Sequence, residues 1–331
     1  MLRGSLLVDI PDNERMEKSV NQNQKNLLTR TWMVCLTAFL CCALWGSAFP
    51  CVKVGYELFS IAAEDVASQI VFAGMRFALA GVLVIGIGSI VNRKFLCPKK
   101  GSLGMVGKLA MVQTVLQYLF FYVGLANTTG VKSSILVASN VFFSILIASL
   151  LFHYEKLTVP KITGCILGFA GVVIINLTGA GMDGGLRLTG EGFILFSALA
   201  YAFSSVLVKK YSAKEDPVAL SGYQFLLGGI VLTACGLAMG GRVHGFTMAS
   251  TGLLIYMAMI SAVAYTLWSI LLKFNPVSKV AVFGFMNPVC GVVLSALILN
   301  EKNQAFSVQG FAALVLVCIG IYQVNHVSEK G

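Results

Sequence analysis

One apolar hairpin occurs twice in the sequence, and this duplication is the feature that most constrains the fold. The first copy covers residues 131–152 and 160–177, and the second covers 277–299 and 306–324. The turns between the arms begin at Glu155 and at Glu301, which lie 146 residues apart. Each arm has about 20 apolar residues, the length that a helix needs to cross a bilayer. The duplication therefore predicts a membrane protein built from two related halves.

The composition excludes a soluble protein. Of the 331 residues, 57% are hydrophobic and only 11% are charged, whereas a soluble domain carries about 25% charged residues. The apolar runs are long and do not alternate with polar residues, so they are typical of helices and not of the strands of a membrane barrel. The fold class predicted is an all-α membrane protein.

Ten apolar segments follow one another with short connectors. They cover residues 32–56, 69–91, 104–125, 131–152, 158–178, 189–210, 217–239, 249–272, 277–299 and 306–325. Five of them form each half, and because five is odd, the second half must cross the membrane in the opposite direction. We expect ten transmembrane helices in two inverted five-helix repeats, an architecture of secondary transporters.

The same pattern predicts the domain organisation. We expect a cytoplasmic tail over residues 1–31, a first repeat over 32–178, a connector over 179–188, a second repeat over 189–325 and a cytoplasmic C-terminus over 326–331. The tail is polar and mixed in charge, unlike a cleaved signal. Either Met1 or Met16 could be the true start.

The basic residues indicate how the chain is oriented. With the N-terminus inside, 18 of the 24 Lys and Arg residues fall on the inner face and four on the outer face, in agreement with the positive-inside rule. Both termini are then cytoplasmic in a multi-pass protein of the inner membrane. The net charge of +10 is thus a signal of topology, and no nucleic-acid partner is expected.

Arg76 is the residue that most strongly suggests a binding site. It lies well inside the second span, where an arginine costs about 2.5–3.5 kcal/mol on insertion scales, and no Asp or Glu falls in the middle of any span. Two interpretations stay open. Arg76 either bonds helix carbonyls or reaches toward the interface, or it binds a carboxylate or phosphate of a substrate.

Other side chains at depth are candidates for the same pocket, with helix packing as the alternative. The substrate-binding candidates besides Arg76 are Trp45, Tyr122, Asn140, Tyr201, Gln224, Tyr265, Trp268 and Asn287. Several occupy equivalent places in the two repeats. Gly46, Pro50 and Pro288 are candidate hinge or gating residues, because proline removes a helix hydrogen bond.

Small residues are spaced for close helix packing in the second and fifth spans. Gly74 and Ala78 are followed by Gly81, and Gly164 and Gly168 by Gly171. This spacing lets two helix backbones approach each other closely.

Catalytic and metal-binding motifs were not found. The nine cysteines include no CxxC pair, the three histidines are scattered, and the glycine-rich stretch 179–185 lacks a following GK[ST]. We therefore expect no catalytic residues, no metal and no cofactor, and a protein that is not an enzyme.

Short motifs in order along the chain resemble the EamA repeat of the drug/metabolite transporter (DMT) superfamily. They are the stretches 45–53 (WGSAFPCVK), 76–77 (RF), 155–158 (EKLT), 287–289 (NPV) and 300–302 (NEK). The resemblance covers nearly all of 32–325 and implies ten helices in inverted halves that move small metabolites, often exporting amino acids. Many members carry Glu-Pro where this chain has Asn287-Pro288, so that buried carboxylate is absent here.

The expected function is export of amino acids or similar carboxylated solutes by alternating access. The expected partners are a small-molecule substrate and the lipid bilayer. Three alternatives stay open: a sugar-phosphate or nucleotide-sugar exchanger, an intramembrane enzyme, and a non-transporting membrane scaffold or receptor. Proton coupling is also left open, as is the choice between a monomer and a homodimer.

Overall fold

The structure, a computed structural model, describes residues 27–128, 130–176, 187–298 and 308–328. These residues form helices and no strands. Eight of the helical stretches are long and apolar enough to cross a membrane, and the two shorter apolar helices Val159–Ile174 and Gly310–His326 match the remaining predicted spans. The prediction of an all-α membrane fold with ten spans is thus confirmed.

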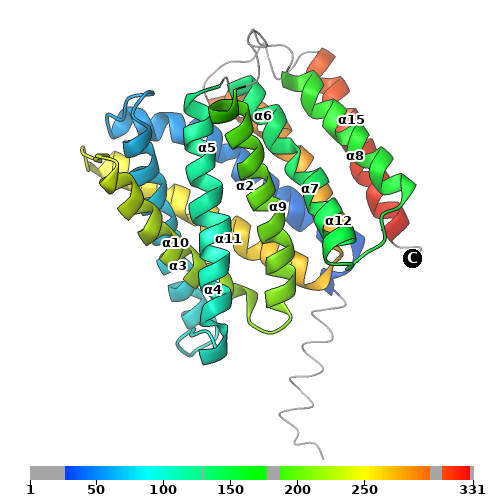
Figure 1. Cartoon of the computed structure of the whole chain (residues 1–331), viewed down its shortest axis with the longest axis horizontal. Helices are drawn as coiled ribbons and strands as arrows, with labels where there is room; N and C mark the ends of the chain where they lie inside the picture. The colour runs from blue at the N-terminus through cyan, green and yellow to red at the C-terminus, as the bar shows by residue number, and fades with distance from the viewer. Residues whose placement is uncertain (1–26, 129, 177–186, 299–307, 329–331) are drawn as a thin grey trace, which may run out of the picture.

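The elements of the first half follow the first five predicted spans. They are α2 (Thr31–Leu58), α3 (Val66–Val91), η1 (Lys100–Ser102), α4 (Leu103–Leu109), η2 (Ala110–Leu116), α5 (Gln117–Ala126), α6 (Gly130–Ala138), α7 (Asn140–Leu146), η3 (Ile147–Leu151) and α8 (Val159–Asn176). Figure 1 shows them in blue to green.

The second half repeats the plan. Its elements are η4 (Leu188–Gly192), α9 (Phe193–Ser212), α10 (Pro217–Ala238), α11 (Met248–Phe274), α12 (Val277–Ala281), η5 (Val282–Phe285), α13 (Met286–Ile298) and α15 (Val308–Ser328). The predicted turn at Glu301, most of the predicted tail 1–31 and connector 179–188, and the last residues of the predicted C-terminus 326–331 lie outside the described residues.

Polar residues before three helices explain where those helices begin. Asp65 accepts a hydrogen bond from the Ser68 amide at the start of α3, at 3.0 Å. At the start of α10, where Pro217 occupies the first turn, the Asp216 side chain accepts a hydrogen bond from the Val218 amide. Thr247 forms a capping box at the start of α11. Each cap satisfies an amide that would otherwise have no helical partner.

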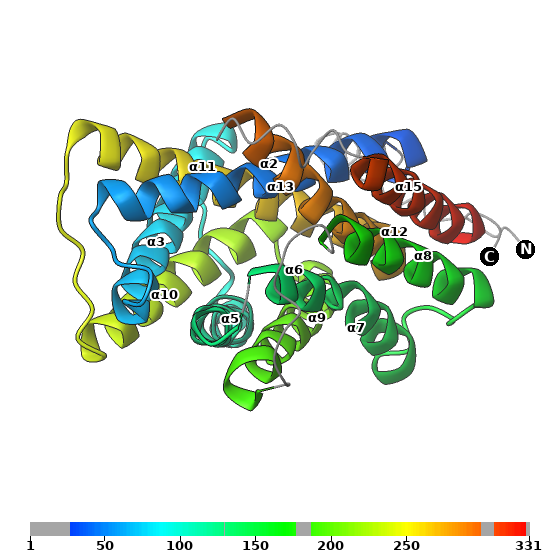
Figure 2. The same ribbon diagram turned by 90° about the horizontal axis from the view of Figure 1, so that it is seen from above.

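The first helix of each half packs against helices of the other half. The first span, α2, packs against α11 and α13 of the second half. The equivalent span of the second half, α9, packs against α5 and α7 of the first. The two halves therefore lie interleaved, as the mixture of early and late colours in Figure 2 shows.

The predicted small-residue contacts are present at two helix crossings. A Cβ on Gly74 or Gly81 would lie 2.4 Å from backbone atoms of α10, and a Cβ on Gly164 or Gly171 would lie 2.8 Å from backbone oxygens of α15. Helices α3 and α10 are the second spans of the two repeats, and α8 and α15 are the fifth spans. The two members of each pair run side by side in both views (Figures 1 and 2). Glycine is needed where these backbones approach so closely.

Four of the described spans depart from regular α-helix, and one of them, the sixth, begins with the π-helical turn η4. The third contains the π-helical turn η2, and the fourth is interrupted at Ser139 between α6 and α7. The ninth, equivalent to the fourth, changes to the 3₁₀ segment η5 just before Pro288. Pro288 has no amide to offer the carbonyl of Gly284, so the regular α pattern fails there. The candidate hinge residue Pro288 thus follows directly on an irregular segment of the ninth span.

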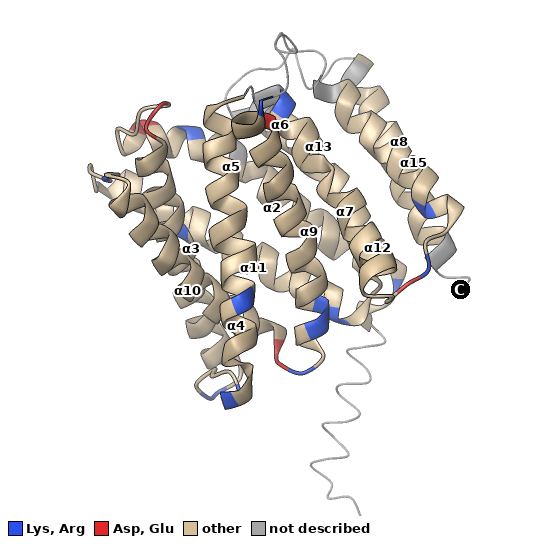
Figure 3. Cartoon of the chain, viewed as in Figure 1, with Lys and Arg blue, Asp and Glu red and all other residues tan. Residues whose placement is uncertain are grey.

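Charged residues gather at the two ends of the bundle. In Figure 3 most Lys and Arg lie at the end formed by α4 and the last turns of α9, and few lie at the other end. We call the first the lysine-rich end. Its basic side chains include Lys161, Lys209, Lys214, Lys273 and Lys279.

Candidate functional site

Arg76 is a buried cation held by aromatic rings. Its side chain on α3 is 6% exposed. The guanidinium carbon lies 4.4 Å from the ring centre of Phe77 and 5.9 Å from that of Tyr118. Such contacts stabilise a cation through the negative faces of the rings. The Nε atom is buried and has no hydrogen-bond partner among the described residues, so one donor of the guanidinium is left for another group.

Aromatic side chains from both halves surround this cation. Tyr118 of α5 and Tyr265 of α11 are joined through their hydroxyls at 2.7 Å. The ring centre of Trp45 on α2 lies 5.0 Å from those of Tyr265 and Trp268. Edge-to-face pairs at this distance fix ring positions. The cluster therefore joins α2 and α5 of the first half to α11 of the second.

Tyr122 and Tyr201 belong to the same cluster. Tyr122 is 3% exposed and packs with Phe77, Phe225 and Tyr265, and the partly buried Tyr201 of α9 packs against the same group. Five of the predicted aromatic candidates thus come together, and they do so close to Arg76. We call these five, with Arg76, Phe77, Tyr118 and Phe225, the Arg76 cluster.

Gln224 lies on α10, directly before Phe225 of the Arg76 cluster. Its Oε1 accepts a hydrogen bond from the Thr114 hydroxyl of η2 at 2.8 Å, and its buried Nε2 has no partner among the described residues. Gln117, on the next turn after Thr114, has a buried Oε1 that is likewise unpartnered. The indole Nε1 of Trp45 is a third such atom. Buried polar atoms usually find partners, so a group of unpartnered ones suggests water or a ligand.

Asn140 and Asn287 lie at the interrupted fourth and ninth spans. The Asn140 Oδ1 is 3.7 Å from where a Cβ on Gly284 would be, which places Asn140 beside η5. Asn287 begins the next turn, and its Oδ1 is buried without a described partner. Both residues thus lie next to η5, and no described contact joins them to the Arg76 cluster.

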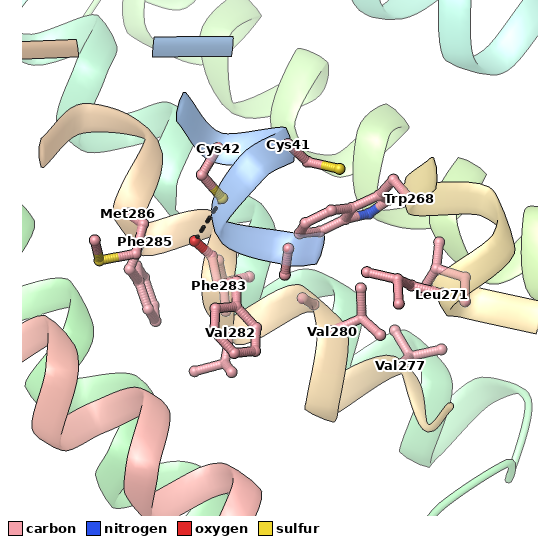
Figure 4. Close-up of a cluster of buried hydrophobic side chains, with 14 of the residues drawn as sticks. Cys41, Cys42, Trp268, Leu271, Val277, Val280, Val282, Phe283, Phe285 and Met286 are labelled. Carbon is pink, nitrogen blue, oxygen red and sulfur yellow. Dashed lines mark hydrogen bonds between the residues drawn. The ribbon is translucent and has the colours of Figure 1, made fainter. Parts of the chain in front are cut away.

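The candidate hinge residues occupy packed positions. A Cβ on Gly46 would lie 2.7 Å from the Cβ of Cys290, so Gly46 allows α2 to approach α13 closely. Pro50 is buried inside α2, which continues as helix on both sides of it. Next to Gly46, the Cys42 thiol donates to the Phe283 carbonyl of η5 at 3.2 Å, as Figure 4 shows. The thiol thus binds a carbonyl of the irregular turn before Pro288.

Sequence reasoning missed Tyr118, Phe77 and Phe225 as members of the cluster. The signal for Tyr118 was present, since it lies four residues before Tyr122 and hence on the same helix face. Phe77 follows Arg76 directly, and Phe225 is its equivalent in the second repeat. Among the described residues, no group of three or more His, Cys, Asp or Glu side chains is arranged to hold a metal ion.

Comparisons with known proteins agree with this architecture. The sequence model of the EamA-like transporter family matches residues 32–177 and again residues 188–325. The chain is similar to the uncharacterized transporter YvbV of Bacillus subtilis (strain 168), with 27% identity over 91% of this chain and 94% of the relative.

A relative with a more specific name is also similar along the chain. The probable terminal-alkyne amino-acid exporter of Streptantibioticus cattleyicolor is 23% identical over 89% of this chain and 92% of the relative. A crystal structure of a protein with 15% sequence identity superposes with a TM-score of 0.74 over 90% of this chain and 98% of the other. At this identity the likeness concerns the fold.

Proposed function

We propose that the protein exports amino acids or similar carboxylated solutes. The premise is that this chain belongs to the EamA-like transporter family, whose model matches both of its halves. The substrate would bind between repeats 32–178 and 189–325. Alternating access would then follow from motion of one half against the other, to the extent that the substrate binds one conformation better.

The observation that carries this proposal is the buried state of Arg76. Removing an arginine from water is costly unless its charge is compensated. Its described neighbours supply aromatic faces, and the ion pairs between described side chains join Lys132 to Glu191 and Lys161 to Glu155. A substrate carboxylate would supply the missing countercharge and would accept from the free Nε donor.

The polar atoms around the cluster support a solute with more than one polar group. Trp45 Nε1 offers a further donor and Gln117 Oε1 an acceptor, which suits a carboxylate and an amine on one small molecule. The similarity to the probable terminal-alkyne amino-acid exporter of Streptantibioticus cattleyicolor is consistent with this class of solute.

The charge distribution supports an orientation for the chain. The lysine-rich end would face the cytoplasm of an inner membrane, with both termini on that side, by the positive-inside rule. The transport proposed here involves no catalytic step, metal or cofactor.

A sugar-phosphate or nucleotide-sugar exchanger is less well supported. Such substrates carry several negative charges and call for several basic side chains at one site. Within the described residues Arg76 is the basic member of its cluster, and Lys53 of α2 is exposed. The carboxylated solute, with a single negative charge, fits the cluster better.

Uptake into proteoliposomes tests the proposal. The purified protein is reconstituted, and uptake of a radiolabelled amino-acid mixture is compared for wild type, Arg76→Gln and Lys53→Gln. Loss of a hydrogen-bonded charge pair costs about 1.5–3 kcal/mol, so Arg76→Gln should lower uptake at least about tenfold. Lys53→Gln, which removes an exposed cation outside the cluster, should transport as wild type does. Equal uptake by Arg76→Gln, with normal folding, would exclude the proposed role.

A further inference from the structure

Glu155 lies in the turn after η3 and touches the other half of the molecule. We propose that its carboxylate is a latch that closes the lysine-rich end by tying this turn to the start of α12. The latch must open whenever a solute passes through that end. This inference rests on the proposed transport function, which supplies the need for two conformations.

The contacts of Glu155 are short and numerous. Its Oε1 accepts from the Ser278 amide at 2.9 Å, and its Oε2 accepts from the Ser278 hydroxyl. The same Oε2 accepts from Lys161 Nζ at 2.6 Å, and Lys161 also donates to the Lys156 carbonyl. Both charged side chains are 7% exposed. Hydrogen bonds to an ionised group that is shielded from water are among the strongest in proteins.

The latch joins segments that belong to different halves. Glu155 lies between the fourth and fifth spans and Lys161 in the first turn of the fifth, whereas Ser278 lies 123 residues after Glu155, at the start of the ninth. Five residues of α12 then lead into η5 and the break before Pro288. A bond to Ser278 therefore holds the segment that leads into an irregular helix, where a span can bend at low cost.

A second carboxylate ties the halves at the opposite end. Glu191 of η4 accepts from the Thr128 hydroxyl at 2.7 Å and from Lys132 Nζ at 3.2 Å. Helix α9 begins just after Glu191, and Lys209 near its other end donates to the carbonyl of Asn275, three residues before Ser278. Lys209 lies 18 positions after Glu191 along this helix, a rise of about 27 Å. The two carboxylates thus mark opposite ends, and with both bonded the halves are held together at each.

Tryptophan quenching measures whether the latch controls access to the Arg76 cluster. The chain has three tryptophans, and Trp32 is 55% exposed. In a Trp32→Phe background the signal comes from Trp45 and Trp268, which lie in the cluster. Acrylamide quenching in nanodiscs then reports how open the cluster is to water, with no substrate needed.

Three substitutions in that background give the test. Glu155→Gln and Ser278→Ala each weaken the same bond, which should shift the closed-to-open equilibrium by about tenfold and raise the quenching constant at least about twofold. The double variant should add little more, because the two residues share one interaction. Asp216→Asn is the matched control, since it neutralises an exposed acid at the same end and keeps a helix-capping side chain.

Hydrogen exchange of the same proteins tells which end has opened. Glu155→Gln should speed exchange in peptides covering 153–161 and 275–281, and leave peptides that contain Glu191 unchanged. Glu191→Gln should give the reverse pattern. A variant that had merely lost stability would speed exchange at both ends alike, and that result would overturn the proposal.

The outcomes separate the latch from the substrate proposal. Quenching at the wild-type level in both Glu155→Gln and Ser278→Ala, with unchanged melting, would refute the latch even if Arg76→Gln abolished uptake. Raised quenching together with normal uptake by Arg76→Gln would support the latch and remove the role of Arg76. If Glu155→Gln failed to fold, Ser278→Ala, which keeps the Glu155–Lys161 pair, would decide alone.

Discussion

Replacing Gly229 by alanine should destabilise the crossing of α3 and α10. A Cβ at this position would lie 2.2 Å from the Ala78 amide nitrogen, 2.7 Å from the Ala78 Cα and 2.8 Å from the Gly74 carbonyl oxygen. All three are backbone atoms, so no side-chain rotation can relieve the contact. The helices must move apart along the surface by which the repeats are joined.

The size of the effect follows from these distances. Restoring an ordinary carbon contact of about 3.5 Å requires the helices to separate locally by roughly 1 Å. Overpacking of this kind costs about 1–3 kcal/mol, and a backbone clash belongs at the upper end of that range. Alanine regains up to about 1 kcal/mol of helix propensity. The expected net loss is about 2 kcal/mol.

Thermal unfolding in detergent, followed by intrinsic fluorescence, measures this loss. For a chain of 331 residues about 2 kcal/mol should lower the melting midpoint by about 3 °C. Gly86→Ala is the matched control on α3, because a Cβ there meets nothing within 4 Å. That control should melt at or slightly above the wild-type temperature. A Gly229→Ala protein as stable as Gly86→Ala would refute the packing argument.

Two further predictions concern single polar atoms. Trp45→Phe should raise the KM for a carboxylated solute about tenfold, because the unpartnered Nε1 is lost, while the melting midpoint stays close to wild type; an unchanged KM would contradict a role in binding. Asp65→Asn should alter the pH dependence of melting, since hydrogen bonds from Ser68 hold the pKa of Asp65 below its ordinary value of 3.8. A depressed folded pKa contributes stability above 3.8 that is lost as the pH falls through the folded pKa. The advantage of wild type over Asp65→Asn should therefore be present at neutral pH and disappear in acid, and an advantage that persisted at low pH would contradict this.

Much of the fold could be predicted because the bilayer imposes one helix length and the duplication shows it twice. The ends of α10 and α11 fall within two residues of the predicted spans 217–239 and 249–272. The glycines of α3 and α8 were recognised as packing residues because close helix contacts have a spacing that can be read in one chain.

The site was less predictable, because a contact between distant segments leaves no local pattern. Arg76 stood out by its charge, and the aromatic candidates by their depth. The hydrogen bond of Thr114 to Gln224 and the bond of Glu155 to Ser278 join residues more than 100 positions apart. The π-helical turn η2 also had no signal, since its composition is that of an ordinary apolar helix.

The exchanged packing of α2 and α9 has a consequence for how such a chain could arise. In each half, the surface that faces the first helix of the other half would be uncovered if that half, which has the opposite orientation, were missing. A single five-helix copy would thus be complete only as an antiparallel pair, with one subunit inserted each way. Fusing the two genes fixes both orientations in one polypeptide. After that, the sequence of each copy can change separately: the first repeat has Arg76 where the second has Gln224 at the equivalent position.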